Sequence, residues 1–586
     1  MAQFPFTARR VALSMLTAAA VLVPAGTTAQ GVAGPYLAAE QAARRGDLLA
    51  ASEYYTAALA RDPDNAAMTE RAISHLIAAG RLSQSIGLAR RLQQLEPGRH
   101  VAVMAVAVDE LRRGEADEAG LVLELATNGD TPLVGRIVQA WALFGQDDPD
   151  AAISALEALA EEGLGGPAGA SIAAYHRGLI EAAIGDDLDA VAAFEVSAEQ
   201  SSLGSQRFVR HRSGALARVG RTDEAIALID ARLDRTLGAA RLERLRDDLA
   251  AGAMPEPLVR DAAAGAAEAL YDFARYLMSG PNSLLGLSYA RLAVHLAPDI
   301  VDAHLLIAEQ LRRQEQPELA IAAYDLVPSD VPESLEARIG RAEALEDADR
   351  LVDAIDALDA VIASFPDSLD AHSALGTMLR QNERFAEAAE AYDRAVALID
   401  EAENRHWPLF YQRGISYERS KQWPKAEADF KTALELEPDQ PLVLNYLGYS
   451  WVEMGTNLDE AKAMIEKAVE QRPDDGYIVD SLGWVLYRLG DFEGAVKHLG
   501  RAVELRPVDP VINDHYGDAL WMVGRRIEAE FQWHRALSFE PEPEDEARIL
   551  RKLDIGLDTV LEEEAAAGNP AIIGQTGAPS EPRDGG

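Results

Sequence analysis

Aromatic and acidic side chains share one helical face near the end of this 586-residue chain. Asp480, Trp484 and Tyr487 follow one another at spacings of four and three residues, which places them on one side of an α-helix. Large amphipathic rings set among polar groups are what protein interfaces use to recognise a peptide. Equivalent positions in the segments before and after add Asn445, Tyr449, Val452, Asp514, Asp518 and Trp521. These nine residues are called the aromatic–acidic strip below.

Two interpretations of the strip stay open from the sequence. Its side chains either line an open groove that binds a partner, or pack against neighbouring segments and the final helix. The distribution of tryptophan favours binding, because six of the seven tryptophans lie between residues 407 and 533 and only some occupy core positions. We predict that Trp451 and Trp533 are core residues and that Trp484, Tyr487 and Trp521 face outward.

The sequence contains no recognisable constellation of catalytic or metal-binding residues. Its 11 histidines are scattered, and neither an HExxH pair nor a GxSxG turn is present. The glycine-rich run 163–169 follows no predicted strand and lacks the lysine of a phosphate-binding loop, which favours a helix-to-helix turn. The lack of cysteine excludes disulfides, thiolate metal sites and cysteine catalysis. We therefore predict a non-enzymatic protein without a cofactor or a metal.

The strip belongs to a sequence repeat with a period of 34 residues. The windows 476–507 and 510–541 align at this spacing, and a fixed period of this length indicates stacked structural repeats. The matched pairs are Leu482/Tyr516, Gly483/Gly517, Leu486/Leu520, Gly490/Gly524, Ala495/Ala529, Leu499/Trp533, Ala502/Ala536 and Pro507/Pro541.

Each window predicts two antiparallel helices. Gly490 ends the first helix, because a residue without a Cβ adopts the left-handed conformation cheaply. Small residues such as Gly483 and Ala495 let the two backbones approach, and Pro507 closes the second helix. Neither helix buries its apolar stripe alone, so successive pairs must stack on one another.

This pattern of small and large residues with a closing proline resembles the tetratricopeptide repeat (TPR) family. In that family the side of the first helix opposite its packed positions lines a concave groove, so the resemblance implies that the strip faces a partner. A branch of the family that binds chaperone tails holds a terminal carboxylate with basic groove residues. Asp480, Asp514 and Asp518 occupy groove positions here, which argues against such a ligand.

The repeats predict an all-α, right-handed superhelical solenoid of about fourteen TPR units in two halves. A degenerate N-terminal array spans 30–238 and a more regular C-terminal array spans 267–543. Between them, 239–266 breaks the period and is predicted as an irregular helical linker. An amphipathic capping helix over 544–567 covers the last apolar face, and the tail 568–586, rich in Gly, Pro and Ala, is predicted to be disordered.

The first 29 residues predict a secretory signal peptide. Arg9 and Arg10 precede the apolar run 11–23, and small residues up to Ala29 offer a cleavage site. Thirteen apolar residues are fewer than the roughly 20 needed to span a bilayer, although an uncleaved anchor stays open. Without a cysteine the chain cannot be a lipoprotein, so we predict a periplasmic protein with no membrane span after cleavage.

The net charge of −41 disfavours nucleic acid as a partner, because binding there depends on neutralising phosphates. Residues 441–543 resemble proteobacterial envelope TPR proteins, including the lipoprotein adaptors that deliver cell-wall hydrolases to carboxyl-terminal processing proteases. The resemblance implies a scaffold or adaptor that binds a protein or peptide partner, such as an envelope protease or a cell-wall hydrolase. Those adaptors are lipidated and this chain has no cysteine. An accessory subunit of envelope export or polysaccharide secretion machinery is the alternative.

Overall fold

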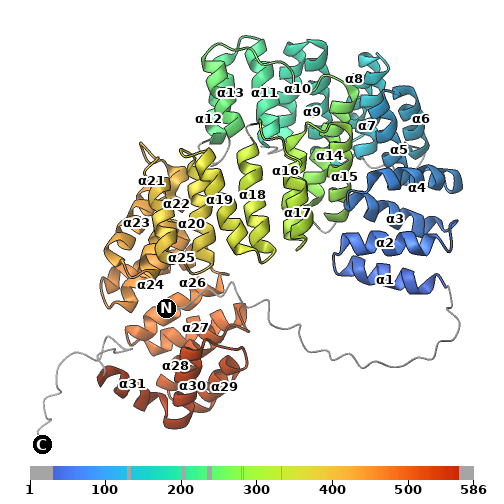
Figure 1. Ribbon diagram of the computed structural model, residues 1–586. Coiled ribbons are helices and arrows are strands. Elements are labelled where there is room, and N and C mark those ends of the chain that lie inside the picture. The colour runs from blue at the N-terminus through green and yellow to red at the C-terminus, as the bar shows by residue number, and fades with distance from the viewer. Residues whose placement is uncertain are drawn as a thin grey trace, which may run out of the picture. The chain divides into compact units, whose positions relative to one another are not determined.

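The computed structural model describes residues 31–127, 133–200, 205–233, 240–278, 280, 283–331 and 333–566. These residues form 31 α-helices and one short 3₁₀ helix, without a β-strand among them (Figure 1). The predicted all-α repeat fold is therefore confirmed. No helix in the described part of the chain is both long and apolar enough to cross a membrane. The predicted signal peptide, 1–29, and the predicted tail, 568–586, lie outside the described residues.

The chain divides into two compact units, with the boundary between Met378 and Leu379 inside α20. The helices of the larger unit are α1 (Ala33–Arg44), α2 (Leu48–Leu59), α3 (Ala66–Ala78), α4 (Leu82–Leu95), α5 (His100–Arg113), α6 (Ala116–Thr127), α7 (Leu133–Gly145), α8 (Pro149–Glu161), α9 (Gly166–Ile184), α10 (Asp187–Gln200), α11 (Gln206–Arg218), α12 (Thr222–Leu233), α13 (Ala240–Ala250), α14 (Ala262–Met278), α15 (Ser283–Leu296), α16 (Val301–Arg313), α17 (Pro317–Tyr324), α18 (Ser334–Asp347), α19 (Leu351–Ser364) and most of α20 (Leu369–Gln381).

The smaller unit continues from the end of α20. Its helices are α21 (Phe385–Val396), the 3₁₀ helix η1 (Asn404–His406), α22 (Trp407–Arg419), α23 (Trp423–Leu436), α24 (Pro441–Glu453), α25 (Leu458–Gln471), α26 (Gly476–Arg488), α27 (Phe492–Leu505), α28 (Pro510–Met522), α29 (Arg526–Leu537), α30 (Pro543–Ile555) and α31 (Leu557–Ala566). Over both units the described helices make fourteen successive pairs, with α13 single and α30–α31 following the last repeat, in agreement with the predicted repeat number.

The hairpin of α26 and α27 shows why the repeat folds. Gly490 has a φ of +84° and ends α26, and Asp491 then caps α27 by accepting a hydrogen bond from the Gly494 amide at 3.0 Å. A Cβ on Gly483 would lie 2.5 Å from Leu499 Cγ, so glycine is what lets the two helices approach. The predicted packing register of this repeat is therefore confirmed.

The segment 239–266 does not separate two halves in the structure. It holds a charged helix, α13, followed by irregular backbone over 251–261. Beyond it, however, α14 packs against α5, α7 and α9, and α15 packs against α3 and α5 (Figure 1). A Cβ on Gly265 would lie 2.1 Å from Trp141, and His100 Nε2 lies 2.6 Å from the Tyr289 hydroxyl. The two compact units therefore divide at 378/379 and not at 239–266. The reason is that α14 and α15 pack against the first helices of the earlier repeats and so belong to the same unit.

The end of the repeat array differs in one detail from the predicted single capping helix over 544–567. Gly556, with a φ of +83°, divides this segment into α30 and α31. Ile549, Leu557 and Val560 are buried against the last repeat, as a cap requires, whereas Leu550 is 50% exposed. A turn between the two short helices lets both place an apolar side on the array.

A matched pair of substitutions in one repeat tests the close approach of α26 and α27. Gly483→Ala should destabilise the smaller unit by about 1–3 kcal/mol, because its methyl group overlaps Leu499. Gly500→Ala in α27 meets nothing nearer than the Tyr516 hydroxyl at 3.4 Å, and should be neutral or stabilising by up to about 1 kcal/mol. Urea unfolding followed by tryptophan fluorescence measures both, and equal effects would contradict the packing described here.

Candidate partner-binding surfaces

The aromatic–acidic strip is largely buried, contrary to the expectation that it faces an open groove. Trp484 is 7% exposed, and Val452, Tyr487 and Asp518 have no exposed surface. Asn445, Asp480 and Asp514 are also buried, and only Tyr449 and Trp521 are half-buried. The packing interpretation therefore describes these residues, and the predicted outward orientation of Trp484 and Tyr487 is wrong. Trp451 and Trp533 lie in the core, as predicted.

The aromatic members of the strip pack against one another and against the next repeat. The Trp484 ring stacks on Tyr487 at a centroid distance of 4.8 Å and on His515 at 4.1 Å. Its indole N–H donates to Glu453 at 2.8 Å. Trp521 lies 5.3 Å from the Trp533 ring, with the guanidinium of Arg526 over it. Trp484 thus links its own repeat to the repeats before and after it, whereas Trp521 packs on Trp533 within the last repeat.

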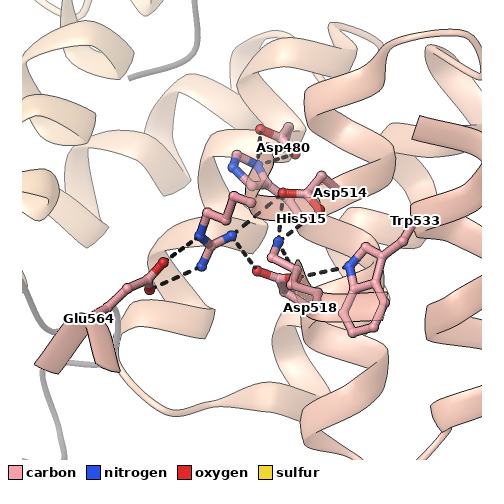
Figure 2. A network of polar contacts seen from close by, with 8 residues as sticks. Asp480, Asp514, His515, Asp518, Trp533 and Glu564 are labelled. Carbon is pink, nitrogen blue, oxygen red and sulfur yellow. Dashed lines mark hydrogen bonds and ion pairs between the residues drawn. The ribbon is translucent and has the colours of Figure 1, made fainter. Parts of the chain in front are cut away.

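The acidic members of the strip hold the cap in place (Figure 2). Lys552 of α30 is buried and donates to Asp514 at 2.8 Å and to Asp518 at 2.6 Å. Arg548, one turn earlier on α30, donates to Asp518 at 3.1 Å and to Glu564 of α31 at 2.7 Å. Since the two basic residues are four apart, one face of α30 carries the cations that neutralise the two aspartates of α28.

The buried carboxylates differ in their electrostatic environment. Burial raises the pKa of Asp514 despite the opposing charge of Lys552. Burial alone would also raise the pKa of Asp518, but Lys552 and Arg548 hold it below its usual value. The Trp533 indole N–H donates to Asp518 at 2.9 Å as well. Asp518 is therefore the carboxylate that the cap and the core most firmly keep ionised.

His515 pairs with the third aspartate of the strip. Its Nδ1 lies 3.0 Å from an Asp480 oxygen (Figure 2). Burial alone would lower the pKa of His515, but Asp480, with smaller effects from Asp514 and Asp518, raises it above its usual value. The charged pair therefore stabilises the folded unit at pH values below the pKa of the imidazole.

An open cleft lies instead in the larger unit, along the first helices α14, α16, α18 and α20. It has a volume of about 720 Å³. The positions that line it recur at the repeat period, as in the series Leu305, Ile339 and Ser373. Its acidic positions, including Asp302, Glu336 and Asp370, recur in the same way. We did not predict this cleft from the sequence, although the 34-residue spacing of its acidic residues is a signal that could have revealed it.

One group of carboxylates in the described residues could in principle approach a cation. Oxygen atoms of Glu181, Asp186 and Asp189 lie within 4.8 Å of one another, and the latter two residues are exposed. Arg177 already donates to Glu181 at 3.1 Å. Acidic groups at a helix end are common without a bound ion, so this arrangement does not indicate a metal site.

The repeat geometry agrees with comparisons to known families. A tetratricopeptide repeat model matches residues 36–100, 137–205, 305–368, 339–403 and 455–510, and a second model of the same repeat matches 407–440. Together these segments cover more than half of the chain. The chain belongs to the tetratricopeptide repeat family. TPR folds generally bind protein partners, and the chain is accordingly a protein-interaction scaffold in its broad class.

Individual relatives are distant. A stretch of 94 residues is 36% identical to the TPR repeat-containing protein PA4667 of Pseudomonas aeruginosa, and it covers 16% of this TPR chain and 16% of that protein. The structure of the APC/C Cut9–Hcn1 hetero-tetramer matches over 83% of this chain and 96% of that chain, with 13% identity and a TM-score of 0.39. Yeast Tom70 matches over 91% and 99%, with 14% identity and a TM-score of 0.34. Values at this level do not indicate a shared function.

Removing the buried cation of the cap should destabilise the smaller unit strongly. Lys552→Met leaves Asp514 and Asp518 buried without their shared partner, at a cost of about 3–5 kcal/mol. Lys467→Met is the matched control, because it breaks an exposed pair with Asp439 and should cost at most about 1 kcal/mol. Urea unfolding followed by tryptophan fluorescence measures both, and similar losses would show that α30 does not depend on this contact.

The Asp480–His515 pair should give the smaller unit a pH-dependent stability. Asp480→Asn removes the counter-charge and should cost about 1.5–3 kcal/mol at pH 6, where His515 is charged in the wild type. The cost should shrink at pH 9, because a raised imidazole pKa contributes stability that is lost as the pH rises through it. Chemical unfolding at both pH values measures the change. A difference that is the same at pH 6 and pH 9 would contradict a charged His515.

Proposed function

We propose that this chain is a periplasmic, non-enzymatic TPR scaffold that holds a segment of a partner protein in the cleft along α14, α16, α18 and α20. The observation that supports the proposal is that the first helices of the repeats are covered by other helices in some parts of the chain and open in another. The row α3, α5, α7 and α9 is covered by α14 and α15, and the aromatic–acidic strip is largely buried, with Lys552 of α30 over its last two aspartates. Along α14, α16, α18 and α20, by contrast, the described residues leave a cleft of about 720 Å³ open.

The lining of the cleft suits a protein segment better than a small metabolite. It combines apolar side chains such as Leu305 and Ile339 with charged groups from successive repeats. Interfaces use this mixture of apolar contact and fixed polar positions. Since the same positions recur on each helix, a bound chain would meet an equivalent set of groups at every repeat.

The proposed cellular role rests on the resemblance of residues 441–543 to envelope adaptors and on the predicted signal peptide. In that role the scaffold brings a client, such as a cell-wall hydrolase, to an envelope protease. If the chain is instead an accessory subunit of export machinery, the same cleft would bind a different partner, a component of that machinery.

Site-specific photocrosslinking in intact cells tests the proposed surface. A photoreactive amino acid at Ile339 in the cleft should yield a crosslinked product of discrete size. The control position is Val352 on α19, which is 73% exposed, does not line the cleft, and should yield none. Products of equal abundance from both positions, or from neither, would contradict the proposal. Mass spectrometry of the product identifies the partner and separates the adaptor role from the export role.

Cell fractionation tests the proposed location separately. The processed chain should be released with the periplasmic contents, with an amino terminus at residue 30. Full-length chain in the membrane fraction would support an uncleaved anchor, and cytoplasmic chain would contradict export.

A further inference from the structure

Four acidic residues form a ladder at an exact spacing of 34 residues. Glu268, Asp302, Glu336 and Asp370 occur on α14, α16, α18 and α20, which are successive first helices of the repeat array. Neighbouring helices in this row contact each other, as α14 does α16 and α16 does α18. The last three of these residues line the open cleft, and Glu268 lies buried at its start.

The chain's own arginines neutralise the first two positions of the ladder. Arg207, at the start of α11, donates through Nη2 to Glu268 at 2.5 Å and through Nη1 to Asp302 at 2.6 Å. Arg241 of α13 donates to the same Asp302 oxygen at 2.5 Å and pairs with Glu333. The carboxylates of Glu268 and Asp302 are therefore both neutralised by arginines that lie outside α14, α16, α18 and α20.

The last two positions of the ladder have no such partner. Neither Glu336 nor Asp370 forms an ion pair with any residue that the structure describes. Burial raises the pKa of Glu336 to about 7, with further contributions from Asp302 and Glu309 on α16 and from Glu333 at the start of α18, and an opposing one from Arg241. Burial, together with Glu243, raises the pKa of Asp370 as well. Glu336 is exposed in the open cleft and Asp370 is half-buried there, so a cation on a bound segment could reach both carboxylates.

A tyrosine in the wall of the cleft offers a polar group to a bound segment. Tyr271 lines the cleft and is only 7% exposed. Its hydroxyl makes no hydrogen bond within the described part of the chain and is accessible to water, so a bound segment could donate to it or accept from it. The guanidinium groups of Arg207 and Arg275 lie 5.6 and 5.9 Å from its ring centroid. The ring is thus held in place with its polar end unused.

We propose that the partner segment bound in this cleft is basic, with arginine or lysine side chains that pair with Glu336 and Asp370. This rests on the proposed function and specifies the chemistry of its partner. The guanidinium groups of Arg207 and Arg241 on the first two rungs show how such a side chain meets this repeat position. A charge-assisted pair of this kind is strong where the surroundings are partly desolvated.

The distribution of cations in the cleft supports this partner over an acidic one. Arg241 is already paired with Glu333, and Arg312 is paired with Glu343 and Asp347. Arg232, at the α12 edge, is the lining arginine without a carboxylate partner among the described residues. Negative charge without a counter-ion is therefore concentrated on α18 and α20.

Peptide binding to the full chain tests the inference. The probe is a fluorescent 12-residue peptide of alternating arginine and serine, capped at both ends, and anisotropy at pH 8 and about 150 mM salt measures its Kd. The double variant Glu336→Gln, Asp370→Asn should bind at least tenfold more weakly than the wild type. The control, Asp356→Asn with Asp359→Asn, changes the net charge equally on exposed positions of α19 outside the cleft, and should bind as the wild type does.

Equal losses in the two double variants would overturn the inference, because the peptide would then respond only to the net charge of −41. Equal affinity for a matched glutamate–serine peptide would overturn it too. A pH series gives a second measurement: affinity for the arginine peptide should rise several-fold from pH 6 to pH 8 as Glu336 ionises, and Glu336→Gln should remove most of the rise. A rise that survives this substitution would contradict the role of Glu336.

The two proposals fail in distinguishable ways. If crosslinking at Ile339 captures a partner, but the Glu336→Gln, Asp370→Asn variant captures it equally well, the cleft binds a partner that is not recognised through these carboxylates. The present inference then fails and the proposed function stands. If crosslinking at Ile339 captures nothing while the arginine peptide binds as expected, Glu336 and Asp370 do bind basic side chains. The proposal that the cleft holds a partner in the cell then fails.

Discussion

A single helix pair of this protein cannot bury its apolar surface, and this constraint organises the whole chain. Within the pair, Gly483 lets α26 and α27 approach closely enough for Leu499 to fill the space between them. The remaining apolar surface must be covered by the next pair, so stability depends on contacts between neighbours. The last pair has no successor, and α30 and α31 cover it with Ile549, Leu557 and Val560.

The first helix of each repeat also has a side that does not pack within its own pair. That side is covered by other helices, neutralised by charged side chains or left in contact with water. The chain uses all three solutions. In the early repeats α14 and α15 cover it, with Trp141 against Gly265. At the end of the array, Lys552 and Arg548 neutralise the aspartates that point from it. Along α16, α18 and α20 it stays open and carries the uncompensated carboxylates of Glu336 and Asp370. The surface that we propose for partner binding is thus the one for which the described chain supplies no occupant of its own.

The presence or absence of a neighbouring cation distinguishes Asp514 and Asp518 from Glu336 and Asp370. Asp514 and Asp518 look like ligand-binding groups by position, yet Lys552, a cation 34 to 38 residues later in the sequence, neutralises them within the same unit. Burying these charges without Lys552 would be unfavourable, so the cap and the last repeats form one structure. Glu336 and Asp370 occupy a comparable surface without a cation, and burial raises the pKa of both carboxyl groups. Similar residue types therefore have different roles because of what lies opposite them.

The sequence by itself determined the helical repeat, its period and most of its core. These follow from local rules: helical periodicity places Leu482 and Leu486 on one face, and glycine and proline end helices wherever they occur. The capping segment could also be predicted from the sequence. The four-residue spacing of Arg548 and Lys552 could have indicated two cations that pair with the aspartates.

Only the tertiary structure decided which faces stay open. Periodicity shows that Asp480, Trp484 and Tyr487 share a side of α26, but not that His515 stacks on Trp484 or that α30 covers the neighbouring aspartates. Nor does it show that α14, more than 100 residues after α7, returns to pack against it. Such contacts join residues distant in sequence, and whether a side chain is a core residue or a binding residue depends on them.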